Sequence, residues 1–290
     1  MKKYRLQDMS WMEAQEAFQR SDTVVVPVGT LHAHGPIPIG IDARSVEKLS
    51  EEVGKRTGLM VLPVLAYGEN DKMKDYPGSI TISQDVIEAA YTDICRSLHR
   101  NGVRKVIFLN GHGGNHDPLL RAGRSVRALG MLVAIVEWGY IEKALRPDLF
   151  TEGNFTSEYA LAELAVAVAA DGPEIADLRG GWYKGEWGFP PVTRTLFGEK
   201  IRPLGFSTFE YAGAQVTIPV DAWEIDVESP PEIERGTLEA LRRRGEETIE
   251  RMTEYICAFA GEFQKIDVAN TLTRPDAHAR GRSGGASPLG

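Results

Sequence analysis

Four short apolar runs, each followed by a segment long enough for a helix, restrict the fold of this 290-residue chain more than any other feature. The runs are residues 23–28, 59–65, 105–110 and 131–138. They are apolar at successive positions, which is typical of strands that are buried on both faces of a sheet. Strands that alternate with helices predict a parallel sheet covered by helices on both sides. The fold class is therefore α/β.

Helix signals lie between these runs. Ser10 and Glu13 form a capping box for a first helix, and Asp42 stands where it can cap a helix that ends near residue 56. A third helix is predicted to begin at residue 83 or 85 and to end before 102, and a long one covers 231–263. The spacing of elements indicates a single domain over residues 1–268.

Two segments depart from this pattern. Residues 179–207 mix glycine, aromatic residues and proline without periodicity, which predicts an irregular excursion that covers a pocket or makes a subunit contact. Residues 271–290 contain few apolar side chains and are predicted to be disordered.

The net charge of −8 argues against nucleic acid or an anionic membrane as a partner, since both require a basic face. A small neutral or cationic ligand fits better. The charged first 20 residues and the lack of a long apolar stretch predict a cytoplasmic protein with no membrane segment. Cys95 and Cys257 lie in helical patterns and are expected to be buried free thiols.

Histidines gather where the predicted strands end. His32 and His34 follow the first run, Asp42 is close behind, and His112 follows the third run in NGHGGN. Ligands of parallel sheets bind at the carboxyl ends of strands, so these side chains form a plausible site for zinc, manganese or iron. Two simpler roles are possible, since Asp42 can be only a helix cap and His112 can serve only a glycine turn. NGHGGN lacks the lysine and Ser/Thr of a phosphate-binding loop.

Three motifs, in this order, carry a resemblance to a known family. VVPVGTLHAHGPIPIGID, YPGSITIS and FLNGHGGN resemble signatures of the creatininase (creatinine amidohydrolase) family, over about residues 24–261. The resemblance implies a three-layer α/β/α sandwich, a homo-oligomer that is commonly a hexamer, and one or two divalent metals per chain at the carboxyl edge of the sheet.

The resemblance also implies a ligand set. His32 stands where the family usually has a glutamate, and His34, Asp42 and His112 match family ligands. The family's His-Ala-Gly-x-x-Glu-Thr-Ser segment supplies a last glutamate, and GNFTSEYALAE aligns Glu158 with it. The implied sets are His32, Asp42 and His112 for one metal, and His34, Asp42 and Glu158 for the other.

The chain departs from the family at several positions. Besides His32, Gly153 and Met73 stand where the family has histidines, and the turn before Asp42 is one residue short. A neutral imidazole in place of a carboxylate either weakens the first metal or makes its bound water more acidic, and it favours zinc or iron over magnesium. Creatinine itself becomes an unexpected substrate.

The resemblance predicts a metal-dependent hydrolase that acts on a carbonyl of a small, cyclic, amide-type substrate. One alternative is carbon–carbon ring opening of an oxidised inositol, and another is a metal- or ligand-binding relative without catalysis. Candidates for proton transfer are Glu152, Asp71, Lys72 and His116, and candidates for the pocket wall are Tyr76, Asn115, Trp138 and Trp182.

Overall fold

The computed structural model describes residues 3–34, 37–150, 155–172, 175, 200–205, 207–221 and 238–269. Most of the predicted excursion at 179–207 and the whole predicted tail at 271–290 lie outside these residues.

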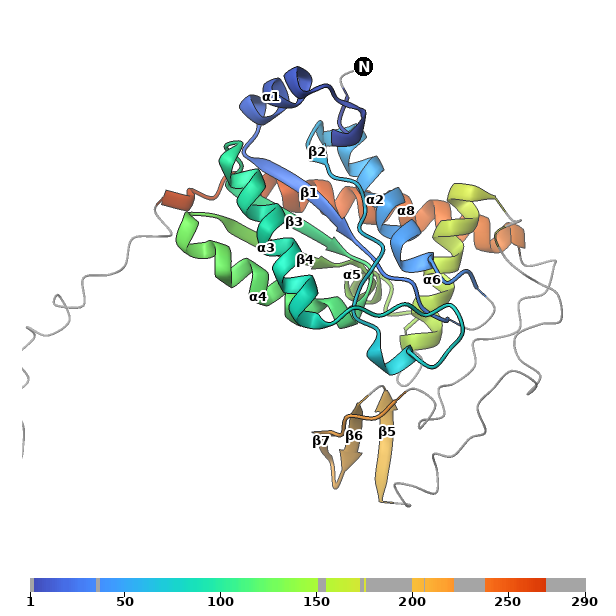
Figure 1. The fold of residues 1–290 in the computed structure, drawn as a ribbon. Helices are drawn as coiled ribbons and strands as arrows, with labels where there is room; N and C mark the ends of the chain where they lie inside the picture. Colours follow the sequence, from blue (N-terminus) through green and yellow to red (C-terminus); the bar gives the residue numbers. More distant parts are fainter. Residues whose placement is uncertain are drawn as a thin grey trace, which may run out of the picture.

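Four parallel strands form the central sheet (Figure 1). They are β1 (Thr23–Val28), β2 (Met60–Val61), β3 (Lys105–Asn110) and β4 (Leu132–Glu137), in the spatial order β2-β1-β3-β4. The register pairs Val28 with Asn110, and Asn110 with Glu137. The carboxyl ends of three strands therefore meet at one edge, and the loops that follow them start side by side.

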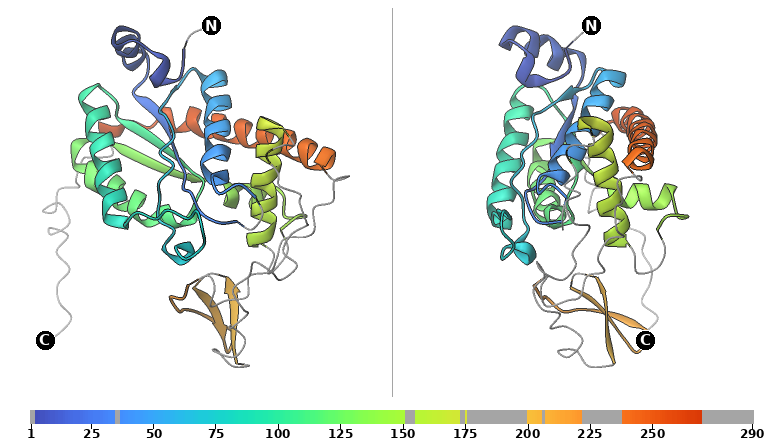
Figure 2. Two further views of the ribbon diagram at one scale, coloured as in Figure 1. Left: turned by 45° about the vertical axis from the view of Figure 1, so that its right-hand side comes forward. Right: turned by 90° about the vertical axis from the view of Figure 1, so that its right-hand side faces the viewer.

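Helices cover both faces of this sheet, which confirms the three-layer prediction (Figure 2). One face carries α1 (Trp11–Arg20), α3 (Gln84–Arg100) and α4 (His116–Val126), and the other carries α2 (Ile41–Thr57), α6 (Phe155–Asp171) and α8 (Leu238–Gln264). The short helix α5 (Trp138–Leu145) follows β4 and contacts α8. No described helix is both long and apolar enough to cross a membrane.

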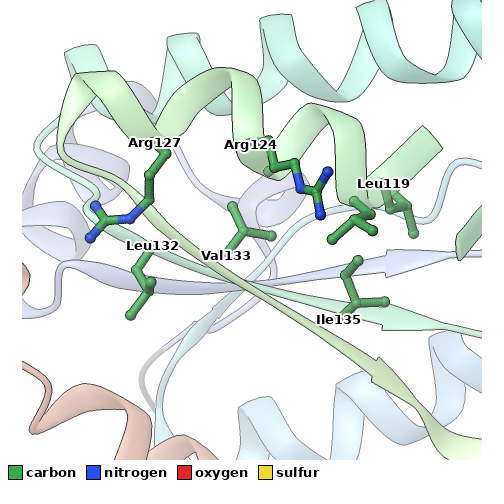
Figure 3. A pocket seen from close by; sticks show the side chains of 8 residues that line it. Leu119, Arg124, Arg127, Leu132, Val133 and Ile135 are labelled. Carbon is green, nitrogen blue, oxygen red and sulfur yellow. The ribbon is translucent and has the colours of Figure 1, made fainter. Parts of the chain in front are cut away.

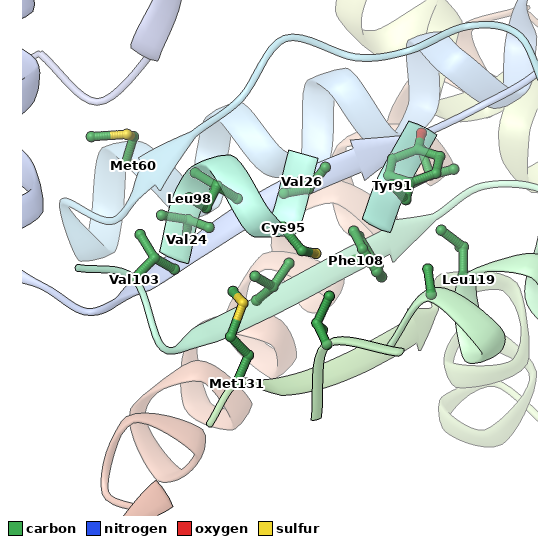
Figure 4. Packing of buried hydrophobic residues seen from close by; sticks show 14 of the residues in the cluster. Val24, Val26, Met60, Tyr91, Cys95, Leu98, Val103, Phe108, Leu119 and Met131 are labelled. Atoms are coloured by element: carbon green, nitrogen blue, oxygen red, sulfur yellow. The ribbon is translucent and has the colours of Figure 1, made fainter. Parts of the chain in front are cut away.

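Each face of the sheet has its own core. Val24, Val26 and Phe108 point to the α3 and α4 side, where they pack with Tyr91 and Cys95 (Figure 4). Val25, Ile107 and Leu109 point to the other side. This alternation is what a strand buried on both faces requires, and it explains why the runs read as continuously apolar. Of the two free cysteines, Cys95 is buried and Cys257 is partly buried.

The strands at 23–28 and 105–110 have the predicted bounds, whereas the predicted strand at 59–65 is wrong in extent. Only Met60–Val61 pair in the ladder, and pairing resumes as an isolated bridge between Val28 and Leu65. Pro63 lies between them and has no N–H to donate, which accounts for the interruption.

The capping box of Ser10 and Glu13 is present at the start of α1. The predicted capping role of Asp42 is wrong, because α2 begins at Ile41 with Gly40 at the cap position. Asp42 instead lies in the first turn and is wholly buried, which leaves its carboxylate free for another use. The last helix, α8, begins at Leu238 among the described residues, and 231–237 lie outside them.

A second, small sheet is antiparallel and consists of β5 (Ile201–Gly205), β6 (Thr208–Tyr211) and β7 (Ala214–Thr217). The prediction of an irregular excursion over residues 179–207 is wrong at its end, because residues 201–205 form the strand β5. Its Pro203 masks the strand signal in the sequence, yet proline is tolerated because β5 is an edge strand of this sheet. Lys74 and Asp221 form an ion pair at 3.7 Å between the loop after β2 and the residues after β7.

At the other side of the main sheet, β4 is the edge among the described strands. An open groove of about 360 Å³ lies between β4 and α4 (Figure 3). Its walls are leucine, valine and isoleucine side chains, together with Arg124 and Arg127. The groove contains none of the histidines or carboxylates at the carboxyl edge.

Candidate metal centre

The loop after β1 fixes the proton positions of its two histidines. His32 Nδ1 lies 3.0 Å from the carbonyl oxygen of Ala33, and His34 Nδ1 lies 3.2 Å from that of His32. Because a carbonyl can only accept a hydrogen bond, each ring donates from Nδ1. Each Nε2 atom therefore has a free lone pair, which is the tautomer that a metal ligand needs.

Both of these Nε2 atoms face one buried carboxylate. His32 Nε2 is 3.1 Å from Asp42 Oδ2, and His34 Nε2 is 3.0 Å from Asp42 Oδ1. In the tautomer set by the backbone, these contacts bring acceptors together, and either a proton or a metal cation between them would satisfy both. Burial, with His34 nearby, lowers the pKa of His32 and disfavours a proton in that role. A divalent cation satisfies the same atoms, and His32, His34 and Asp42 are grouped closely enough to hold one.

His112 joins this cluster from the loop after β3. Its Nδ1 atom is 3.0 Å from Asp42 Oδ2 and 3.1 Å from His32 Nε2. Gly111 allows the approach, because a Cβ there would lie 2.5 Å from the carbonyl oxygen of Asp42. Two loops and the first turn of α2 thus bring three imidazoles to one carboxylate.

A second buried carboxylate, Glu163 of α6, lies behind His34. Its Oε2 atom is 3.8 Å from His34 Nε2, and its side chain has no exposed surface. Within the described part of the chain, neither Glu163 oxygen nor Asp42 Oδ1 has a hydrogen-bond partner in good geometry. Tyr159 and Asp42 interact with Glu163 without ideal geometry, and a divalent metal would satisfy these poorly paired buried oxygens.

The electrostatics of the two carboxylates are opposite. Burial, and then the charge of Asp42, raise the pKa of Glu163 well above its usual range. Burial also acts to raise the pKa of Asp42, but His34, His32 and a hydrogen bond from His112 outweigh it and hold that pKa well below its usual range. Asp42 is therefore the permanent anion of the site, and Glu163 becomes one when a cation is bound.

The structure places Glu158, the predicted ligand, elsewhere. Its Oε2 atom accepts a hydrogen bond from Arg244 Nη2 of α8 at 3.1 Å. Sequence reasoning missed Glu163, although it is the one acidic residue in the apolar stretch 160–170. A charge in such a stretch needs a partner. Shifting the family segment by five residues also aligns Glu163 with its glutamate and Glu158 with its histidine.

A separate histidine–carboxylate pair lies at the ends of β4 and α4. His116 Nδ1 is 2.9 Å from Glu137 Oε1, and the His116 side chain is 48% exposed. Asn110 Nδ2 donates to both oxygens of Glu137 at 3.0 Å, and to the carbonyl oxygen of His112 at 2.6 Å. Burial raises the pKa of Glu137. Asn110 thus connects this pair to the backbone of the metal cluster.

The remaining candidates for proton transfer lie in different parts of the chain. Asp71 and Lys72 are exposed on a single 3-10 turn, and Glu152 lies outside the described residues. No contact of Asp71 or Lys72 with the histidine cluster is present in the described structure, so His116 is the predicted proton-transfer residue that the structure connects to it.

The predicted pocket wall is corrected in two places. Trp138 is wholly buried in the core with Val136 and Val166, because its large apolar ring packs below the loops instead of facing a cavity. Asn115 is also wholly buried, and its amide joins backbone groups of Gly29 and Glu69. Tyr76 is partly buried in the loop after β2, and Trp182 lies outside the described residues.

Comparison with known proteins agrees with this geometry. The family model "Creatinine amidohydrolase" matches residues 7–172, which is more than half of the chain. The chain belongs to the creatininase family. Within this family it is similar to proteins with different named activities, all of them hydrolases.

The relatives include creatinine amidohydrolase of Pseudomonas putida (26% identical over 162 residues, 50% of this chain and 62% of the relative). They also include a mycofactocin precursor peptide peptidase of Mycolicibacterium smegmatis (31% over 114 residues, 37% and 46%). A third is 3-dehydro-scyllo-inosose hydrolase of Thermotoga maritima (29% over 109 residues, 37% and 35%). The chain spans less than two thirds of the length of each of these relatives.

Solved creatininases share the fold. A creatinine amidohydrolase crystal structure has a TM-score of 0.69 at 23% identity and covers 92% of this chain and 100% of its own. A structure titled "Creatininase Mn" has a TM-score of 0.68 at 22% identity, with 91% and 100% covered. A mutant creatininase of Zn–Zn type has a TM-score of 0.67 at 21% identity, with 92% and 100% covered.

Proposed function

We propose that this protein is a divalent-metal-dependent hydrolase that cleaves a carbonyl-containing bond of a small substrate. The observation that carries the proposal is the set of acceptors that face each other around Asp42, with three imidazoles and a second buried carboxylate. Membership of a family whose named relatives are hydrolases supports it.

The arrangement suits two metals that share Asp42. His32, His112 and Asp42 Oδ2 would hold one, and His34, Glu163 and Asp42 Oδ1 would hold the other. Imidazole and carboxylate donors suit zinc, manganese or iron. When bound, such metals act as Lewis acids that acidify water and polarise a carbonyl.

His116 is the side chain that we assign to proton transfer. Glu137 holds its Nδ1 atom, which leaves Nε2 as the nitrogen that would exchange a proton with a substrate, and nearly half of the side chain is exposed. A partner carboxylate of this kind orients an imidazole and stabilises its charged form. We assign to this pair the function of the family histidine, which this chain lacks both at Gly153 and, after the shift of five residues, at Glu158.

Cyclic amides remain the first substrate class. The alternative is carbon–carbon ring opening of an oxidised inositol; one relative is named 3-dehydro-scyllo-inosose hydrolase, and a specific observation supports this alternative. Glu158, which aligns with the family histidine after the shift of five residues, forms an ion pair with Arg244 at 3.1 Å and so does not replace a histidine as proton donor to an amine leaving group. A ketone substrate that expels a carbanion depends less on such a donor.

The test is turnover by zinc- and manganese-loaded protein of cyclic amides, 3-dehydro-scyllo-inosose and short peptides, with His34→Ala and His112→Ala as controls. Hydrolysis that both variants abolish supports the proposal, and the substrate turned over selects the class. A protein that binds metal and hydrolyses none of these classes would be a non-catalytic relative. The homo-oligomer, a hexamer by resemblance, and the cytoplasmic location stay predictions, the first checked by sedimentation.

A further inference from the structure

The loop after β2 brings a carboxylate to the outer side of His112. The backbone of Glu69 is anchored to the loop of His112, because the Glu69 N–H donates a hydrogen bond to Asn115 Oδ1 at 2.9 Å. Asn115 Nδ2 in turn donates to the carbonyl oxygen of Gly29 at 3.2 Å. One buried amide therefore joins the loops after β1, β2 and β3 and fixes Glu69 relative to the histidine loop.

Gly114 reveals how close Glu69 and His112 are. A Cβ on Gly114 would lie 2.3 Å from Glu69 Oε2 and 2.7 Å from His112 Nε2. These two distances limit the separation of Oε2 and Nε2 to about 5 Å, which is too long for a direct hydrogen bond but is a span that one bridging water covers. Glu69 Oε1 also accepts from the backbone N–H of Asp71 at 3.4 Å.

The orientation of the His112 ring indicates what a carboxylate at this position can do. Its Nδ1 atom faces Asp42 Oδ2 and His32 Nε2, so Nδ1 is the nitrogen that would bind a metal between these groups, and a ring that binds metal through Nδ1 no longer donates from that atom to Asp42. The proton of the neutral ring is then on Nε2, which is the side where Glu69 lies. A ligating histidine commonly donates its other N–H to a carboxylate, which fixes the tautomer and increases the basicity of the ligand.

The charge of the ligand set is a second reason to expect that Glu69 affects metal binding. His32 occupies a position where the family usually has a glutamate, so the ligand set has one negative charge fewer. Glu69 is partly buried and places a carboxylate behind a ligand of the same predicted metal. An anion at that distance in a partly buried site acts on the metal with little screening.

We propose that Glu69 is a positioning residue that accepts a hydrogen bond from the Nε2–H of His112 through one bridging water, and thereby strengthens metal binding by His112. The inference rests on the metal site of the proposed function. Glu69 touches no predicted reacting atom, so its effect is exerted through His112.

The experiment measures the affinity of metal-free full-length protein for Zn²⁺ and for Mn²⁺, by competition with a chelating dye. The variants are Glu69→Gln, which keeps the size of the side chain, and Asp75→Asn, which removes an exposed charge from the same loop. Both are also made in the His112→Ala background. Circular dichroism and thermal unfolding of the metal-free proteins check that each variant folds.

We expect Glu69→Gln to weaken metal binding about 10- to 100-fold, as loss of a carboxylate behind a ligand does elsewhere. Asp75→Asn should change it less than about 2-fold, because exposed charges are screened. In the His112→Ala background, Glu69→Gln should have no further effect. Equal losses in both loop variants, or a full further loss in His112→Ala, would overturn the inference.

The two proposals fail differently. Wild-type protein that binds neither metal contradicts the proposed function and this inference with it. Wild-type protein that binds and hydrolyses normally, with Glu69→Gln unchanged in metal affinity, contradicts only the role of Glu69. A Glu69→Gln protein that is unfolded without metal is replaced by Glu69→Asp, which keeps the charge and should bind more tightly than Glu69→Ala.

Discussion

Two groups of histidine and carboxylate lie at the same edge of the sheet and differ in how their atoms are satisfied. Around Asp42, the imidazole Nε2 atoms of His32 and His34 face carboxylate oxygens as acceptor to acceptor, and the group is buried. In the pair of His116 and Glu137, a half-exposed imidazole faces a carboxylate that Asn110 already holds. The first group brings together acceptors that a cation would satisfy, whereas the second already pairs donors with acceptors.

The difference comes from the backbone and from burial. Backbone carbonyl oxygens accept hydrogen bonds from the Nδ1 atoms of His32 and His34, so that the Nε2 lone pairs of both rings point towards Asp42. The Nδ1 atom of His116 instead faces the side-chain carboxylate of Glu137 at 2.9 Å, and the ring is half-exposed. The same residue types are thus arranged as the proposed metal site in one place and as the proposed proton-transfer pair in the other.

The largest expected effect is that of Asp42→Asn, which removes the one carboxylate shared by all three imidazoles. We expect metal affinity to fall by more than about 100-fold, beyond the loss for residues behind a ligand. Metal content by plasma mass spectrometry and competition with a chelator measure it. The control is Asp85→Asn, whose side chain is 98% exposed. Retention of wild-type metal content by Asp42→Asn would contradict the comparison.

The second prediction separates the two glutamates of α6. Glu163→Gln should lower the metal content per chain and weaken binding by about 10-fold or more, because it removes a buried anionic ligand. Glu158→Gln should leave metal binding unchanged and cost less than about 1 kcal/mol of stability, since it breaks a partly exposed ion pair. Metal titration and urea unfolding are the measurements, and the reverse ranking would restore Glu158 as the ligand.

The third prediction concerns the pair of His116 and Glu137. His116→Ala should lower kcat about 100- to 10,000-fold while metal content stays at the wild-type value, because loss of a proton-transfer residue has that size. His99→Ala, a partly buried histidine at the end of α3, is the control. A parallel loss of metal in His116→Ala would show that the two groups are one site.

The smallest expected effect is a pH dependence of stability. Burial raises the pKa of Glu137 above its unfolded value of 4.5, so the folded state holds this proton more tightly than the unfolded state. Its stabilising contribution is complete below pH 4.5 and is lost as the pH rises through the raised pKa. In metal-free protein, the stability of wild type relative to Glu137→Gln should therefore decline from pH 4.5 upward. Urea unfolding at several pH values checks this, and a rise would contradict the assigned direction.

Local patterns predicted much of the fold. The β-branched runs at 23–28 and 105–110 become β1 and β3 with those bounds, because buried parallel strands require apolar residues on both faces. Pro63 shortened β2 in a way that hydrophobicity alone does not indicate. The strands of the small sheet, with Pro203 in β5, carried too weak a pattern to be found.

The site residues, like the fold, were predicted only in part from the sequence. The four ligand candidates in the strand-end loops and in the first turn of α2 converge, because parallel strands bring their carboxyl ends together. On α6, Glu158 and Glu163 are five residues apart and so about 140° apart around a helix of 3.6 residues per turn. They cannot face the same neighbour. One faces Arg244 of α8 and the other faces the cluster at α2.

By itself, the sequence determined the parallel sheet, the order of its elements and the loops that carry the histidines, because periodicity and strand-end chemistry are local properties. Only the tertiary structure decided which glutamate of α6 is buried beside His34, that Trp138 belongs to the core, and that Glu69 lies behind His112. These outcomes depend on the rotation of a helix about its axis and on the path of a loop. Both are set by packing between segments that are distant in the chain.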